Sequence, residues 1–253
     1  MRSKVSPSGQ QSDRTFTETA RRAQIMTAAI DTIAELGYGQ ASLARIAEAA
    51  HTSKGVIIYH FGGKDELIKE LLQELITRAG EYMRPRIEAE QTGAGMLRAF
   101  IESNLAFLAE NRNHVAATVE IALNARAADG SRVFGQRFND AAVAAVAEML
   151  THFQGTGEFR ADFDPQVMAM AVRAAIDTVG PRLVRDPGLD VAQHARELAS
   201  LFVRAARSEE SHPALPRASA PARRRETVDG AFPRGSLDVM RATCARSLIS
   251  IGV

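Results

Sequence analysis

Apolar residues recur three and four positions apart along most of the chain, and this spacing places them on one face of an α-helix. No run of alternating apolar and polar residues predicts a β-strand. The most informative stretch is 42–64, where two short helical patterns meet at a tight turn. The apolar face of the first pattern consists of Leu43, Ile46, Ala47 and Ala50. The pattern predicts an all-α protein organised around this pair of helices.

Each helix of this pair is preceded by a residue that can cap it. Ser42 is placed to cap the first helix, and either Thr52 or Ser53 can cap the second. The side chains of the second helix expected to face inward are those of Val56, Ile57 and Phe61. The residues expected to stay on the outside are Ser53, Lys54, Gly55, Tyr59 and His60. Two short helices joined by a tight turn predict a helix-turn-helix.

A longer helix is expected ahead of the pair. Residues 15–18, Thr-Phe-Thr-Glu, form a capping box that begins it, and Gly37 ends it by taking the left-handed conformation common at helix C-termini. Its apolar face is expected to comprise Ile25, Ala29, Ile33 and Leu36. We expect Arg21 and Arg22 to be solvated, with phosphate contact as the alternative. The polar residues 1–14 predict a flexible arm.

Six further helices are expected after this head. The first begins with Asp65 and Glu66, whose charges suit a helix N-terminus, and stops at Pro85. The others are expected over 96–109, 114–126, 134–153, 165–179 and 191–206. The fold predicted is a three-helix head followed by a six-helix domain. The chain should therefore divide into an arm (1–14), a helix-turn-helix domain (15–64), a second domain (65–207) and a disordered, proline-rich tail (208–253).

Composition and charge narrow the class of protein. Aromatic residues make up only 6% of the 253 residues, which favours packed helices over sheets. No stretch approaches the roughly 20 apolar residues of a membrane span, no apolar leader is present, and the single cysteine, Cys244, agrees with a reducing compartment. We therefore expect a cytoplasmic protein. Lys and Arg outnumber Asp and Glu by 8 to 5 over residues 1–64 but stand at 15 to 20 over 65–206. A basic head on an acidic body suits attraction to phosphates, although ordinary surface variation gives similar counts.

The head resembles the tetracycline-repressor (TetR) family of transcriptional regulators. The resemblance runs from about Thr17 to Leu67. Its motifs, in order, are Arg21-Arg22, Glu35-Leu-Gly-Tyr38, Ile46-Ala47, Ser53-Lys-Gly55, Tyr59-His-Phe61 and Lys64-Asp-Glu-Leu67. Two positions depart from the family pattern. His51 stands at the usual turn glycine, although His tolerates a positive φ better than most residues, and Ile58 stands where the family usually has Tyr, which removes one expected DNA contact.

The resemblance implies DNA contact by Lys54, Gly55, Tyr59, His60 and Lys64. The chemistry of a reading helix agrees, because short or hydrogen-bonding residues at its start, here Ser53, Lys54 and Gly55, allow close approach to base edges in the major groove. Phosphate donors are also needed around that helix, and Ser42, His60 and Lys64 can supply them. For Tyr59 and His60 a structural role is the alternative.

No motif in the sequence indicates enzyme chemistry. The six histidines show no metal-ligand spacing, and there is neither a phosphate-binding glycine loop nor a nucleophile motif. We expect no catalytic residue, no metal and no cofactor. Glu120 and Asp177 lie in apolar stretches, and either could face a ligand cavity. The alternative is that Glu120 faces the surface and that Asp177 pairs with a nearby residue.

The resemblance implies a repressor that binds a palindromic operator on double-stranded DNA as a homodimer and is released by a small-molecule effector. Met, Phe and Ala on the middle helices favour an apolar or amphipathic effector. The rival from another class is an all-helical enzyme or carrier with a vestigial helix-turn-helix. An activator of the same family, or a regulator controlled by a protein partner, is a third possibility.

Overall fold

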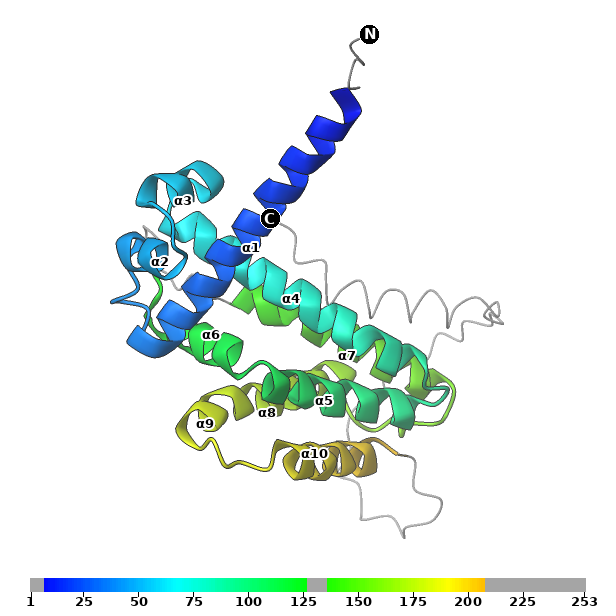
Figure 1. Ribbon diagram of the computed structural model, residues 1–253. Helices are drawn as coiled ribbons and strands as arrows, with labels where there is room; N and C mark the ends of the chain where they lie inside the picture. Colours follow the sequence, from blue (N-terminus) through cyan, green and yellow to red (C-terminus); the bar gives the residue numbers. More distant parts are fainter. Residues whose placement is uncertain (1–6, 127–135, 208–253) are drawn as a thin grey trace. The chain divides into compact units, whose positions relative to one another are not determined.

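The computed structural model describes residues 7–126 and 136–207, and every regular element in these two segments is an α-helix. Figure 1 shows the helices along the chain. In chain order they are α1 (Pro7–Leu36), α2 (Leu43–Ala49), α3 (Lys54–Phe61), α4 (Lys64–Glu88), α5 (Gly93–Glu110), α6 (Arg112–Asn124), α7 (Gln136–Gly155), α8 (Pro165–Asp177), α9 (Val179–Arg185) and α10 (Val191–Ala206). The predicted all-α class is confirmed.

The helices form two compact units, which do not follow the order of the chain. The described parts of Met1–Arg78, Leu108–Gln136 and Thr178–Leu189 make up the first unit, and those of Ala79–Phe107, Arg137–Asp177 and Asp190–Val253 make up the second. The first unit therefore contains α1, α2, α3, the first part of α4, α6 and α9. The predicted domain limits at 14, 64 and 207 stay a prediction.

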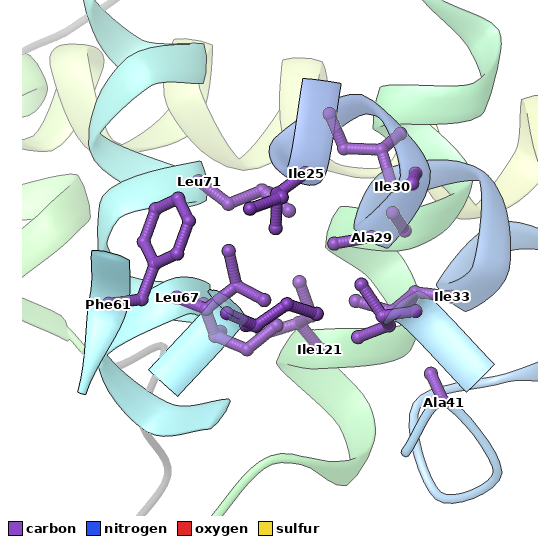
Figure 2. Close-up of a cluster of buried hydrophobic side chains, with 14 of the residues drawn as sticks. Ile25, Ala29, Ile30, Ile33, Ala41, Phe61, Leu67, Leu71 and Ile121 are labelled. Carbon is purple, nitrogen blue, oxygen red and sulfur yellow. The ribbon is translucent and has the colours of Figure 1, made fainter. Parts of the chain in front are cut away.

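A hydrophobic core holds the described part of the first unit together. Figure 2 shows Ile25, Ala29 and Ile33 of α1 converging with side chains from α3, α4 and α6. Ile121 of α6 is fully buried in this cluster, together with Ile46 of α2 and Ile57 of α3. Because α6 supplies part of the core, the helix-turn-helix does not rest on α1 and α4 alone.

The second unit has its own core, in which Met and Phe side chains lie among Leu, Ile, Val and Ala. Phe153 of α7 packs edge-on against Phe159, with ring centroids 5.8 Å apart. A Cβ atom on Gly93 would lie 2.4 Å from the Phe153 ring, so only glycine allows this approach. The Glu158 carboxylate accepts the backbone N–H groups of Gly93 and Ala94, both at 2.9 Å, and so caps the start of α5.

Several helix limits differ from those expected. α1 begins at Pro7 rather than Thr15, so residues 7–14 are helical, and the proline suits this start because N–H groups in the first turn of a helix have no intrahelical partner. α4 continues through Pro85 to Glu88, with Ile87 buried in its last turn. Residues 180–181, Gly-Pro, do not end a helix but lie in the first turn of α9.

The predicted caps of two helices are confirmed, and two other predictions concern residues that the structure does not describe. Asp164 accepts the N–H groups of Gln166 and Val167, and Asp190 caps α10 through the N–H of Gln193, as predicted. Leu36 was expected to face inward and is exposed. The expected tail, residues 208–253, falls outside the described residues, as does the expected helix start at Phe134.

No helix in the described segments is both long enough and apolar enough to cross a membrane.

Candidate nucleic-acid interface

The turn between α2 and α3 has the geometry of a tight helix-turn-helix. Ala50 ends α2, and His51 follows with φ 48°, in the left-handed region. The N–H of Thr52 donates to the carbonyl of Ala47 at 2.9 Å, which closes the turn. Ser53 then caps α3, its Oγ accepting the N–H of Val56 at 3.3 Å. His51 therefore takes the conformation for which glycine is the usual residue, as the sequence suggested.

α3 separates core residues from exposed ones as predicted. Ile57 and Phe61 are buried in the core of the first unit, and Val56 packs partly against it. Ser53, Lys54, Gly55 and Tyr59 are exposed, and the Tyr59 side chain is 77% exposed. The start of α3 thus presents short and hydrogen-bonding residues to the outside, with no bulky side chain at Gly55.

His60 lies between the core and the surface. It is half-buried, and its ring meets the Tyr59 ring edge-on with centroids 5.1 Å apart. Its backbone carbonyl accepts a hydrogen bond from the Arg22 guanidinium. The structural role that the sequence left open for His60 is therefore present at its backbone.

Arg22 was expected to be solvated, and this prediction is wrong. Besides its bond to His60, its guanidinium pairs with Glu70 of α4 and lies 4.4 Å from the centroid of the Phe61 ring. Arg22 therefore joins α1, α3 and α4 through a cation–π contact and charged hydrogen bonds. Within the described residues, the Arg21 guanidinium makes one exposed hydrogen bond, to Gln24 on its own helix at 2.9 Å.

Lys64 has an intramolecular partner that the sequence did not reveal. Its ammonium donates to the Tyr38 carbonyl at 2.8 Å and lies 4.1 Å from the centroid of the Tyr38 ring. Desolvation by burial lowers the pKa of Lys64, partly opposed by Asp65, and burial likewise raises the pKa of the Tyr38 hydroxyl. Lys64 thus holds the loop after α1, and the donors left on its ammonium are those available to a phosphate.

The N-terminus of α2 is the second place where phosphate contact was expected. Ser42 is exposed and caps α2, its Oγ accepting the N–H of Arg45 at 3.3 Å. A helix N-terminus attracts anions, so the capping role and a phosphate role are compatible. Gln24 of α1 donates to the Ala50 carbonyl at 3.0 Å, which ties the other end of α2 to α1.

Glu120 neither lines a ligand cavity nor points freely into solvent, the two interpretations that the sequence left open. Its carboxylate accepts the backbone N–H of Tyr38 at 3.2 Å and the side-chain amide of Asn124 at 3.1 Å. It therefore links α6 to the loop that Lys64 also holds. Asp177, by contrast, pairs with Arg173 one turn earlier on α8, as the local interpretation predicted.

Comparison with known proteins shows the family. Residues 25–71 match the description "Bacterial regulatory proteins, tetR family", and residues 93–208 match "BetI-type transcriptional repressor, C-terminal". This chain belongs to the TetR family. The first match covers the helix-turn-helix, and the second covers most of the remaining helices.

Curated relatives include regulators named BetI, the name that also occurs in the second of these family descriptions. The chain is 34% identical over 85 residues, 33% of its length, to the HTH-type transcriptional regulator BetI 1 of Chromohalobacter salexigens, and this alignment spans 42% of that relative. It is 33% identical over 88 residues to BetI of Stenotrophomonas maltophilia, spanning 34% of this chain and 45% of the relative. The chain thus aligns with less than half the length of these relatives.

Solved structures share the fold. The fatty acid degradation regulator FadR from Bacillus halodurans is 22% identical, covers 72% of this chain and 97% of its own, and superposes with a TM-score of 0.63. FadR from Bacillus subtilis in complex with stearoyl-CoA is 23% identical with a TM-score of 0.61, covering 72% and 97%. At these identities the likeness establishes the fold of TetR-family regulators.

Proposed function

We propose that this TetR-family protein is a cytoplasmic transcriptional repressor that binds a palindromic DNA operator as a homodimer. The main support for the proposal is the exposure of Ser53, Lys54 and Gly55 at the start of α3. This helix is capped, and its opposite side is buried in the core. Such a helix can enter the major groove without bulky side chains holding it away from the bases.

We assign Lys54, Gly55 and Ser53 to base edges, and Tyr59 to a base methyl or a phosphate. Ser42, His60 and Lys64 would contact phosphates on either side of the reading helix. No catalytic chemistry is assigned to this chain, since these residues fit recognition and the curated relatives are transcriptional regulators. An enzyme or carrier with a vestigial helix-turn-helix would not need an intact, exposed reading surface.

Selection from random DNA with the purified full chain tests this proposal. We expect enrichment of a palindrome whose half-sites are about one helical turn apart or a multiple of it. Failure to enrich any sequence, with the protein folded by circular dichroism, would support the enzyme or carrier instead.

We further propose that an apolar or amphipathic effector releases the repressor from its operator. Buried Met and Phe side chains, among them Met96, Phe100 and Phe153, lie among buried aliphatic side chains in the second unit, so its interior is apolar. The related FadR structure with stearoyl-CoA supports a ligand of this chemistry. Thermal-shift screening should compare fatty acids and acyl-CoA with small, highly charged metabolites. Stabilisation by the charged compounds alone would contradict this proposal.

A further inference from the structure

Ile58 is an aliphatic side chain on the outer side of α3. It is 43% exposed, whereas its neighbour Ile57 is fully buried. The core of the first unit therefore has no need of an isoleucine at this position. Ile58 also replaces the tyrosine that is usual in the family, so it cannot make the DNA contact expected of that tyrosine.

The position of Ile58 on the helix places it on the reading surface. An α-helix turns by about 100° per residue, so Ile58 lies one turn beyond Lys54 and only about 40° from it around the axis. Lys54, Gly55 and Tyr59 are all exposed around it. A protein that inserts this face of α3 into the major groove brings Ile58 into the groove together with Lys54.

The chemistry of Ile58 selects its partner in the groove. An aliphatic side chain neither donates nor accepts hydrogen bonds, so it gains nothing from phosphates or from base nitrogen and oxygen atoms. The apolar group that DNA presents on its major-groove edge is the C5-methyl group of thymine. Contact between the two removes apolar surface from water on both sides.

We propose that Ile58 reads the C5-methyl group of a thymine in each operator half-site. This inference rests on the proposed function and extends it by assigning to Ile58, a residue without hydrogen-bonding groups, a role in specificity. It also predicts that the operator contains a thymine at the symmetric position in both half-sites.

Replacing thymine by deoxyuridine tests the contact, because the exchange removes the methyl group and leaves base pairing unchanged. Each thymine of the selected operator is replaced in turn, in both half-sites, and bound to the full wild-type chain. At one symmetric pair we expect affinity to fall by about fourfold per half-site, the factor for one buried methyl group. At the other thymines we expect smaller changes.

Ile58→Ala is the matched protein variant, and it should fold because the position is exposed and alanine favours helix. It should bind the normal operator less tightly than the wild type and bind the deoxyuridine operator with the same affinity as the normal one. Leu123→Ala is the control, since Leu123 is an exposed apolar residue of α6 outside the reading surface. It should keep the wild-type response to deoxyuridine.

Two results would overturn the role of Ile58. One is a wild-type protein that binds the operator specifically but is indifferent to deoxyuridine at every position. The other is an Ile58→Ala protein that retains the full preference for thymine. A wild-type protein that binds no sequence specifically fails at the earlier step and contradicts the proposed function as well.

Discussion

Lys54 and Lys64 begin consecutive helices, α3 and α4, and their ammonium groups have different surroundings. Lys54 is exposed at the start of the reading helix, whereas Lys64 is half-buried and donates to the Tyr38 carbonyl. The first can meet a base edge, and the second is held against the protein. Substitutions at the two positions should therefore differ in kind.

Lys54→Ala should weaken operator binding by about 1–3 kcal/mol per half-site and flatten discrimination at one base pair in each, because the variant has no ammonium to donate to guanine O6 or N7. The effect roughly doubles on a full palindrome, since the dimer contributes the residue twice. Binding isotherms on the operator and on single-base variants measure it. Equal reductions of affinity on operator and scrambled DNA would reduce Lys54 to a phosphate contact.

Lys64→Ala should weaken binding to all sequences more evenly and reduce the salt slope by about one unit for each phosphate that the variant no longer neutralises. It should also lower stability, because the Tyr38 carbonyl loses its charged donor. Both proteins are therefore compared where circular dichroism shows them fully folded. An unchanged salt slope would show that Lys64 serves only the Tyr38 loop.

His51 gives a test of the turn itself. At φ 48° a residue with a Cβ atom is disfavoured by about 1–2 kcal/mol, partly offset by the greater freedom of glycine in the unfolded chain. His51→Gly should raise the free energy of unfolding by about 0.5–1 kcal/mol, and His51→Val should lower it by about 1 kcal/mol or more because β-branched residues rarely adopt positive φ. Urea unfolding at fixed protein concentration measures both. Equal midpoints for the two variants would contradict the turn geometry.

Among the elements, α1 is joined to α3 and α4 by Arg22 in addition to the hydrophobic core. Arg22→Ala removes the cation–π contact with Phe61 and the charged bond to the His60 carbonyl, and should lower the free energy of unfolding by about 1–3 kcal/mol. Its ion pair with Glu70 is partly exposed and adds little. Urea unfolding again provides the measurement.

Arg21→Ala is the matched control for Arg22→Ala. In the part of the chain that the structure describes, the adjacent arginine bonds to Gln24 on its own helix alone, so its removal should change stability by less than about 0.5 kcal/mol. If the two variants are equally stable and only Arg22→Ala loses DNA affinity, Arg22 is a phosphate contact rather than a bracing residue.

Most elements could be predicted from the sequence because their causes are local. The spacing of apolar residues in α2 and α3 and the caps Ser42 and Ser53 lie within a few positions of the helices they specify. Breaks were less predictable. Pro85 looked like a helix stop, but it lies inside α4, where neighbouring residues are buried. Pro181 also looked like a stop, but it lies in the first turn of α9, where a proline is tolerated.

The parts of the site that could not be predicted depend on distant partners. Arg22 meets Glu70 from 48 positions away, and Tyr38 meets Glu120 from 82 positions away. A pattern along the chain shows which face is apolar but not which helix covers it. The exposed reading residues were predictable because they lie on the face of α3 opposite its buried apolar residues.

At the scale of the whole molecule, apolar side chains are exposed on α8 and α10. Val167 and Met170 lie on the same face of α8, and Leu201 of α10 is 63% exposed. We propose that these helices pair with the same helices of a second chain in an isologous contact, the arrangement that the TetR resemblance implies. We expect the residues beyond 207 to be dispensable for this contact.

Met170→Glu combined with Leu201→Glu should convert the dimer to a monomer, because the charged side chains would be buried at the contact. Removing residues 208–253 should leave the dimer intact. Sedimentation at micromolar concentration measures both. A stable wild-type monomer would refute the contact, and dissociation on truncation would place it in the tail.

The central claim is that the exposed start of α3 gives the homodimer sequence-specific DNA binding. Equilibrium binding of the full chain to its selected palindrome and to a scrambled duplex, at several salt concentrations, tests it most directly. We predict two chains per duplex, a palindrome bound about a thousandfold or more tighter than the scrambled sequence, and affinities that fall with salt on both. Equal affinity for the two duplexes at every salt concentration would contradict the claim.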